Sequence, residues 1–231
     1  MPLGQTPYVY QGGQEDLKRI FYDLDGAKSH SISIPAGYGV IKAGTVMGII
    51  TESTNRKNYY VPYVPADTTG DITAAMSDDE ARGFAYMVAD QGGSSKDIYV
   101  SMDDSYKFAV GDHVATIDSS GTDDDGGAIT AIDRTTYSHM AKITVTNTIG
   151  AITVANGACV FIQTAAAAPH VCAKGVLKAA VDTGVGENAK GGQGVLVVKN
   201  AMLYKDNLHC YNDDALADMS WGSESGKYLI L

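Results

Sequence analysis

The chain has little positive charge and no long apolar run, and each shortage excludes a class of protein. Its 231 residues carry 17 Lys and Arg against 27 Asp and Glu, which gives a formal net charge of −10 at pH 7. This charge repels nucleic-acid phosphates, and no run of Lys and Arg reverses it locally, so we expect no nucleic-acid partner. The weakly polar stretch 150–168 is interrupted by Asn, Gln and Thr, which predicts two strands and no membrane partner.

Cysteine is also scarce. Cys159, Cys172 and Cys210 form no CxxC pair and leave one cysteine over in any disulfide set. We therefore expect free buried thiols and no disulfide framework. The first residues, Met-Pro-Leu-Gly-Gln-Thr, lack the basic and apolar regions of a signal peptide, which predicts synthesis in the cytoplasm.

Signatures of catalysis and of metal binding are missing too. The five histidines are scattered with no HExxH or His-x-His spacing, and there is no GxSxG elbow. The acidic stretch 118–126 resembles a calcium loop, but aligning Asp123, Asp125 and Gly126 with that motif puts Ile132 where the motif needs Glu. We interpret the stretch as a solvated turn, and we expect no cofactor, no metal and no enzymatic activity.

Short apolar runs separated by turns are abundant. Gly175–Asp182 and Gly194–Tyr204 are two such runs, and the stretch 184–194 between them holds five glycines in eleven residues. This pattern predicts an antiparallel strand pair joined by a flexible hairpin loop, because no helix follows the glycines to form a phosphate cradle. Evenly spaced short strands over 108–162 indicate a small barrel or sandwich.

Two short segments have helical character. Leu17, Ile20, Phe21 and Leu24 fall at i, i+3, i+4 and i+7, which predicts one face of a short helix over 14–24. Ser77–Glu80 has the spacing of a capping box and predicts a helical turn, while Gly83 argues against a longer helix to 89. The predicted fold class is therefore mainly β with short helical segments.

Tyrosine dominates the aromatic residues, with 14 Tyr against 4 Phe and 1 Trp. A tyrosine ring is apolar with a polar tip, which suits surfaces that become interfaces, although packing on a strand is the simpler interpretation of any single Tyr. The Tyr-bearing start of the chain suits strand addition to a neighbouring sheet edge. The predicted interface residues are Pro7, Tyr8, Val9, Tyr10, Gln11, Tyr59, Tyr60, Tyr63, Tyr204 and Trp221.

Two pieces of the chain carry a resemblance to a known family. The first is Pro35–Ile50, with the run Ile-Lys-Ala-Gly-Thr-Val-Met-Gly, followed by Tyr60–Tyr63. The second is Gly175–Thr183, followed by Val195–Leu208. They resemble the opening strands and the later strand pair of the head-decoration, or capsid cement, proteins of tailed bacteriophages, the lambda decoration-protein family.

The lambda-like proteins are much shorter, because here a long stretch separates the two matching pieces. Insertions are tolerated where their two ends lie close together on the surface, so we expect one at this point. The prediction is an N-terminal arm with a short helix over 1–34, a split β core over 35–75 and 167–231, and an inserted small β-barrel or sandwich domain over 76–166.

The resemblance implies a structural role on a virus particle. It implies a homotrimer on the exterior of the virion, bound to the major capsid protein, with the N-terminal arm reaching across capsid subunits. The alternative is a head-fibre, tail or receptor-binding module that uses the inserted domain to bind carbohydrate or a cell surface. The Asp- and Tyr-rich loops Asp103–Tyr106 and Thr122–Asp125 motivate this alternative.

Overall fold

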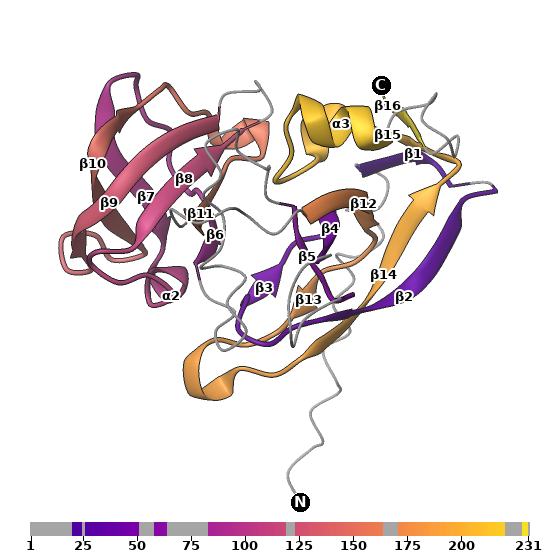
Figure 1. The fold of residues 1–231 in the computed structure, drawn as a ribbon, viewed down its shortest axis with the longest axis horizontal. Coiled ribbons are helices and arrows are strands. Elements are labelled where there is room, and N and C mark those ends of the chain that lie inside the picture. The colour runs from indigo at the N-terminus through magenta and orange to yellow at the C-terminus, as the bar shows by residue number, and fades with distance from the viewer. Residues whose placement is uncertain are drawn as a thin grey trace, which may run out of the picture.

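The computed structural model describes residues 20–24, 26–50, 58–63, 83–118, 123–163, 171–219 and 228–230. The fold is mainly β with short helical segments, as predicted. Its described strands form a six-stranded sheet, a five-stranded sheet, and two small sheets of three and two strands. Figure 1 shows the six-stranded sheet beside the other three.

The six-stranded sheet, which we call the barrel sheet, is built only from residues between 84 and 163. All of its neighbouring strands are antiparallel, in the order β6 (Phe84–Tyr86), β11 (Cys159–Gln163), β8 (His113–Ile117), β9 (Asp123–Asp133), β10 (Met140–Ile149) and β7 (Ser95–Ser101). An antiparallel bridge between Met87 and Val100 connects the two ends of this order. The sheet therefore curls back on itself.

The five-stranded sheet, which we call the split sheet, combines strands from both ends of the chain. Its antiparallel order is β2 (Lys28–Ile34), β14 (Gly192–Lys199), β12 (Val171–Leu177), β4 (Val46–Ile50) and β5 (Tyr60–Pro62). The predicted pairing of the two glycine-linked runs is confirmed, since Val176 of β12 lies opposite Val197 of β14. Pro62 lies on an edge strand, where its missing N–H breaks no ladder. His30 Nε2 lies 3.3 Å from Tyr60 Oη, so the two edge strands meet.

The small sheets and helices complete the described structure. The three-stranded sheet consists of β1 (Phe21–Asp23), β15 (Ala201–Leu203) and β16 (Tyr228–Ile230), and the two-stranded sheet pairs β3 (Val40–Ile41) with β13 (Val181–Asp182). The helical segments are α2 (Met102–Ser105), α3 (Asp213–Met219), η2 (Val154–Asn156), η3 (Gly186–Asn188) and η4 (Lys205–Asn207). Helix α3 packs against β12.

Of the described residues in the predicted helix over 14–24, Ile20 is helical, whereas Phe21–Asp23 forms strand β1. Phe21 lies opposite Leu203, so β1 is held by an antiparallel ladder whose partner is far away in the sequence. Tertiary pairing therefore overrides a local helical pattern here. Residues 14–19 and the predicted capping box at 77–80 lie outside the described residues, and the alternative of a long helix to 89 is replaced by strand β6.

Most of the described part of the acidic stretch 118–126 is strand. Asp123, Asp124 and Asp125 begin β9, where they lie opposite residues 117–115 of β8. Asp124 accepts a hydrogen bond from the backbone N–H of Gly150 at 2.9 Å. The prediction of a solvated turn is therefore wrong for 123–126, where strand pairing satisfies the backbone, and residues 119–122 lie outside the described residues.

The barrel sheet and the split sheet share a core. On β6, the side chains of Ala85 and Met87 belong to the apolar cluster inside the barrel sheet, whereas Phe84 and Tyr86 belong to the cluster that contains Met47 of β4. Both faces of this strand are buried, and the same alternation occurs on β8 and β11. Burial on both faces requires the continuous apolar runs found in these strands. The predicted domain limits, at 75/76 and 166/167, lie outside the described residues.

Candidate functional site

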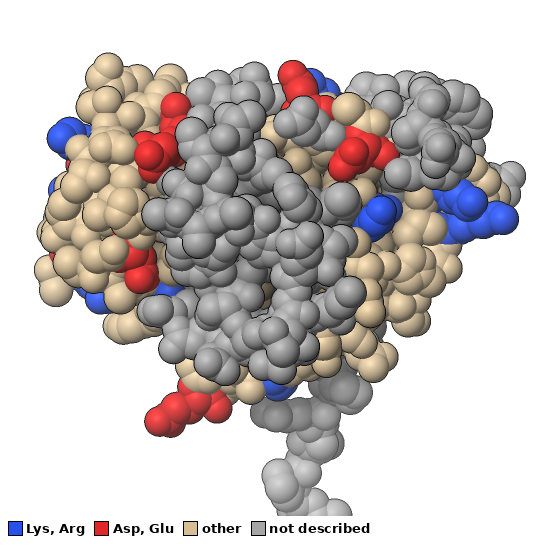
Figure 2. All heavy atoms as spheres, in the orientation of Figure 1, with Lys and Arg blue, Asp and Glu red and all other residues tan. Residues whose placement is uncertain are grey.

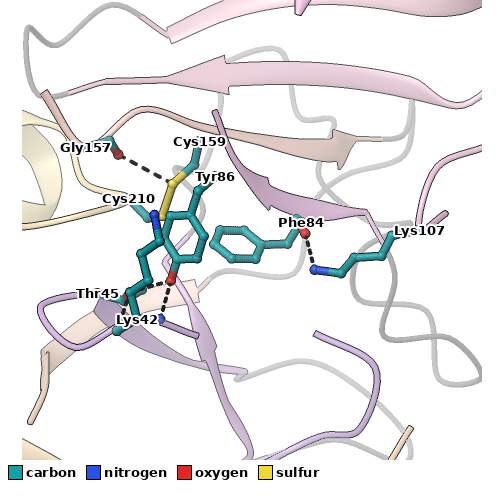
Figure 3. The surroundings of a disulfide bond; sticks show 8 residues. All are labelled: Lys42, Thr45, Phe84, Tyr86, Lys107, Gly157, Cys159 and Cys210. Atoms are coloured by element: carbon teal, nitrogen blue, oxygen red, sulfur yellow. Dashed lines mark hydrogen bonds between the residues drawn. A yellow bond between two sulfur atoms is a disulfide. The ribbon is translucent and has the colours of Figure 1, made fainter. Parts of the chain in front are cut away.

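Several specific contacts join the barrel sheet to the rest of the chain, and we call this region of contact the junction. Figure 3 shows its main side chains, which come from two strand systems and point toward one another. One strand system is the barrel sheet, and the other is the split sheet together with the two small sheets. They are Lys42, Thr45, Phe84, Tyr86, Lys107, Gly157, Cys159 and Cys210.

Tyr86 of β6 provides the central hydrogen bonds of the junction. Its Oη accepts from the backbone N–H of Lys42 at 2.8 Å and lies 2.6 Å from Thr45 Oγ1. Thr45 Oγ1 donates to the carbonyl of Lys42, so the Tyr86 hydroxyl is the donor to Thr45. Burial raises the pKa of Tyr86, which keeps that hydroxyl protonated. The barrel sheet is thereby bonded to the turn between β3 and β4.

Lys107 places a buried cation in the junction. Its Nζ donates to the carbonyls of Tyr38 at 2.7 Å and Phe84 at 2.9 Å, and it forms an ion pair with Asp104 of α2. An ammonium group has three donors, and these three partners use them all. Burial lowers the pKa of Lys107, while Asp104 acts in the opposite direction. Because Tyr38 precedes β3 and Phe84 begins β6, the cation ties the two strand systems together.

A disulfide joins Cys159 to Cys210 across the junction, which corrects the expectation of free thiols. Their Cα atoms lie 5.7 Å apart, although the two cysteines are 51 positions apart in the sequence. Cys159 begins β11, and Cys210 follows His209, which bridges to Thr45 beside β4. The backbone N–H of Cys210 donates to the carbonyl of Gly157 at 3.1 Å. Pairing between distant segments brings the two cysteines together, and their spacing in the sequence does not reveal it.

His209 is half-buried against the ring of Tyr86, with 5.5 Å between ring centroids. Burial, and to a smaller extent Lys42, lowers the pKa of His209 from 6.5 to about 4. The folded protein therefore binds this proton less readily than the unfolded chain, and protonation favours unfolding. The contribution of His209 to stability is complete above pH 6.5 and is lost as the pH falls from 6.5 toward 4.

We expect His209→Asn to remove this pH dependence. Between pH 7 and pH 4.5, the wild-type protein should lose about 2 kcal/mol more unfolding free energy than the variant, because only the wild type carries the histidine. Urea unfolding of both proteins at the two pH values measures the difference. An equal loss in both proteins would show that His209 titrates normally.

The structure places four of the ten predicted interface residues, in different environments. Tyr59 is 39% exposed, and Tyr60 is half-buried beside His30. Tyr63 is only 4% exposed and packs in the core, so its ring is not available as a surface contact. Tyr204 makes an edge-to-face contact with another tyrosine, Tyr22, at 5.6 Å. The other predicted residues lie outside the described part of the chain: Pro7, Tyr8, Val9, Tyr10, Gln11 and Trp221.

The predicted interface residues do not include four strongly exposed apolar side chains. Tyr22, Val40, Tyr106 and Val110 are between 59% and 66% exposed. The sequence gives an indication of exposure for Val110, because this residue precedes Gly111 and Asp112 in a turn. The others lie in short strands or beside a short helix, where the sequence does not reveal which face is covered.

No candidate ion or membrane site emerges from the described ranges. Within them, no three His, Cys, Asp or Glu residues group so that they could hold a metal ion. Among the same residues, no helix has the length and apolar character needed to cross a membrane.

Comparison with known proteins adds no relative. No family model, no curated protein and no solved structure matches the chain. The resemblance to capsid decoration proteins therefore rests on the pieces within 35–63 and 175–208 alone.

Proposed function

We propose that the protein is a capsid decoration, or cement, protein that binds the outer surface of an expanded bacteriophage head as a trimer and stabilises it. The observation that carries the proposal is the meeting of the two pieces that resemble this family. β4 comes from the first piece and the end of β12 from the second, and they pair with Val46 opposite Val176. The whole barrel sheet lies between them in the sequence, as an insertion into a split core requires.

The junction supports a role in holding a lattice together. A disulfide, a buried cation and the Tyr86 hydrogen bonds fix the barrel sheet against the split sheet. A body that is already rigid loses little conformational entropy when it binds. If it binds only the expanded lattice, mass action shifts the equilibrium toward that lattice.

The test is the thermal melting of expanded, empty heads with and without the purified protein. Saturating protein should bind the heads and raise their melting temperature. When the free protein concentration is a hundred times Kd, each occupied site adds about 2.7 kcal/mol to the stability of the expanded head. Unexpanded heads of the same capsid protein are the matched control, and their melting temperature should not change. Expanded heads that neither bind the protein nor gain stability would exclude the proposal.

The alternative, a carbohydrate- or receptor-binding module, makes different predictions. Of the two loops that motivate it, Asp103–Tyr106 contributes most of α2, and Thr122 lies outside the described residues. A glycan array together with antibody labelling of virions separates the two functions. Glycan binding with label on the tail would favour the alternative, and a silent array with label over the head would favour the cement protein.

A further inference from the structure

A pocket of about 580 Å³ opens at the edge of the junction. One wall is α2 together with Tyr106, and the other is formed by the turn before β3 and the turn that follows β13. In Figure 1, α2 lies on the side of the barrel sheet that faces β3. The pocket therefore depends on the fixed relation between the two strand systems.

The walls of the pocket are held before any partner arrives. The carbonyl of Gly39 accepts hydrogen bonds from the backbone N–H and the hydroxyl of Thr183, at 2.8 and 3.0 Å. On the other wall, Ser101 caps α2 by accepting from the N–H of Asp104 at 3.0 Å. Lys107 links the walls through Tyr38 and Asp104. A preformed pocket of this kind favours docking over rearrangement.

The lining of the pocket is acidic and apolar. Val40 is 59% exposed and Tyr106 is 66% exposed. Asp103, Asp104 and Asp182 supply three carboxylates. Asp104 is paired with Lys107 and Asp182 with a lysine 3.6 Å away, whereas Asp103 is exposed and makes no ion pair with another described residue. The pocket suits a partner surface that is basic and carries aromatic rings.

Such a surface exists on the same chain, at the end of the ribbon formed by β2 and β14. Lys28 lies opposite Lys199 there, and neither forms an ion pair with a described residue. Tyr22 and Tyr204 stack edge to face in the adjoining β1–β15 pair. Figure 2 shows basic side chains gathered at this end of the molecule, both acidic and basic ones over the barrel sheet, and acidic ones at the lower edge. We call these four residues the basic end.

We propose that the acidic pocket of one copy receives the basic end of a second copy. The two surfaces are different and lie on different parts of the molecule, so the contact is heterologous, and repeating it closes a ring when the rotation permits. Opposite charge fixes the orientation and overcomes part of the repulsion between copies that each carry a net charge of −10. The inference deepens the proposed function, because it assigns the surfaces that build the trimer.

The test is the molar mass of the protein in solution, measured by light scattering and sedimentation. The wild type should be a trimer, and Asp103→Lys and Lys28→Glu should each raise the dissociation constant about tenfold or more, because each puts like charges in contact. The double variant Asp103→Lys/Lys28→Glu should restore the trimer, since the reversed pair is again complementary. Lys96→Glu reverses an exposed charge on β7 of the barrel sheet and should leave the trimer unchanged.

Three outcomes would overturn the pairing. These are a monomeric wild type, single variants that remain trimers, and a double variant that stays dissociated although both single variants have wild-type melting temperatures. Head binding by the wild type is measured separately. A wild type that binds and stabilises heads as a monomer would therefore leave the cement function standing and remove the trimer together with this assembly.

Discussion

Reducing the bond between Cys159 and Cys210 should lower the melting temperature of the protein by about 10 °C. The bond closes a loop between residues 51 positions apart, and closing such a loop removes about 4 kcal/mol of chain entropy from the unfolded state. In a chain of this length, 1 kcal/mol corresponds to roughly 2–4 °C. Both cysteines are at most 1% exposed, so the bond also holds packed surfaces together. Thermal melting with and without reductant measures the effect.

Two variants make this test specific. Cys172→Ala keeps the bond and should show the same reductant-induced shift as the wild type. The double variant Cys159→Ala/Cys210→Ala should melt near the reduced wild type and show no shift. Thiol titration of the oxidised, denatured protein should count one free thiol, since two of the three cysteines are bonded. Three free thiols, or a melting temperature that is the same with and without reductant, would contradict the bond.

Lys107→Met should lower the free energy of unfolding by about 3–5 kcal/mol. Methionine keeps most of the apolar stem of lysine but leaves the carbonyls of Tyr38 and Phe84 without their donor and Asp104 without its cation. Removing one partner from a buried ion pair has a cost of this size, because the remaining charge is uncompensated. Urea unfolding gives the change as a shift in midpoint at constant slope.

Asp104→Asn and Lys96→Met are the matched controls for Lys107. Asp104→Asn removes the ion pair but keeps both carbonyl bonds, so its loss should be smaller than that of Lys107→Met. Lys96 is exposed and, among the described residues, donates only to the carbonyl of Thr146, so Lys96→Met should change stability by less than about 1 kcal/mol. If Lys107→Met also lowered the free energy of unfolding by less than about 1 kcal/mol, the Lys107 cation would not be what holds the two strand systems together.

Local chemistry made much of the β structure predictable. The alternation at 31–34 and the turn residues Pro35 and Gly39 predict a strand and its end, and β2 ends at Ile34. Gly39 has a φ of 70°, a conformation that glycine adopts without strain. The glycine-rich stretch 184–194 predicts a hairpin loop, and β14, which begins at Gly192, pairs with β12 as expected, whereas the intervening β13 pairs with β3. In each case residues close in sequence decide the outcome.

What the sequence does not reveal depends on contacts between distant residues. Lys107 reads as an ordinary surface lysine, but it is buried because two carbonyls and a carboxylate surround it. Phe21 fits a helical stripe until β15 pairs with it. Cys159 and Cys210 lack any motif spacing, and only the packing of β11 against the 205–210 segment brings them together. The junction as a whole was therefore beyond prediction.

Cryo-electron microscopy of expanded heads incubated with the purified protein tests the central claim most directly. The claim predicts added density on the outer surface at the local three-fold sites, with three copies around each axis and the barrel sheet in a fixed position relative to the split sheet. Heads that remain bare at saturating protein, or density confined to the tail, would contradict it.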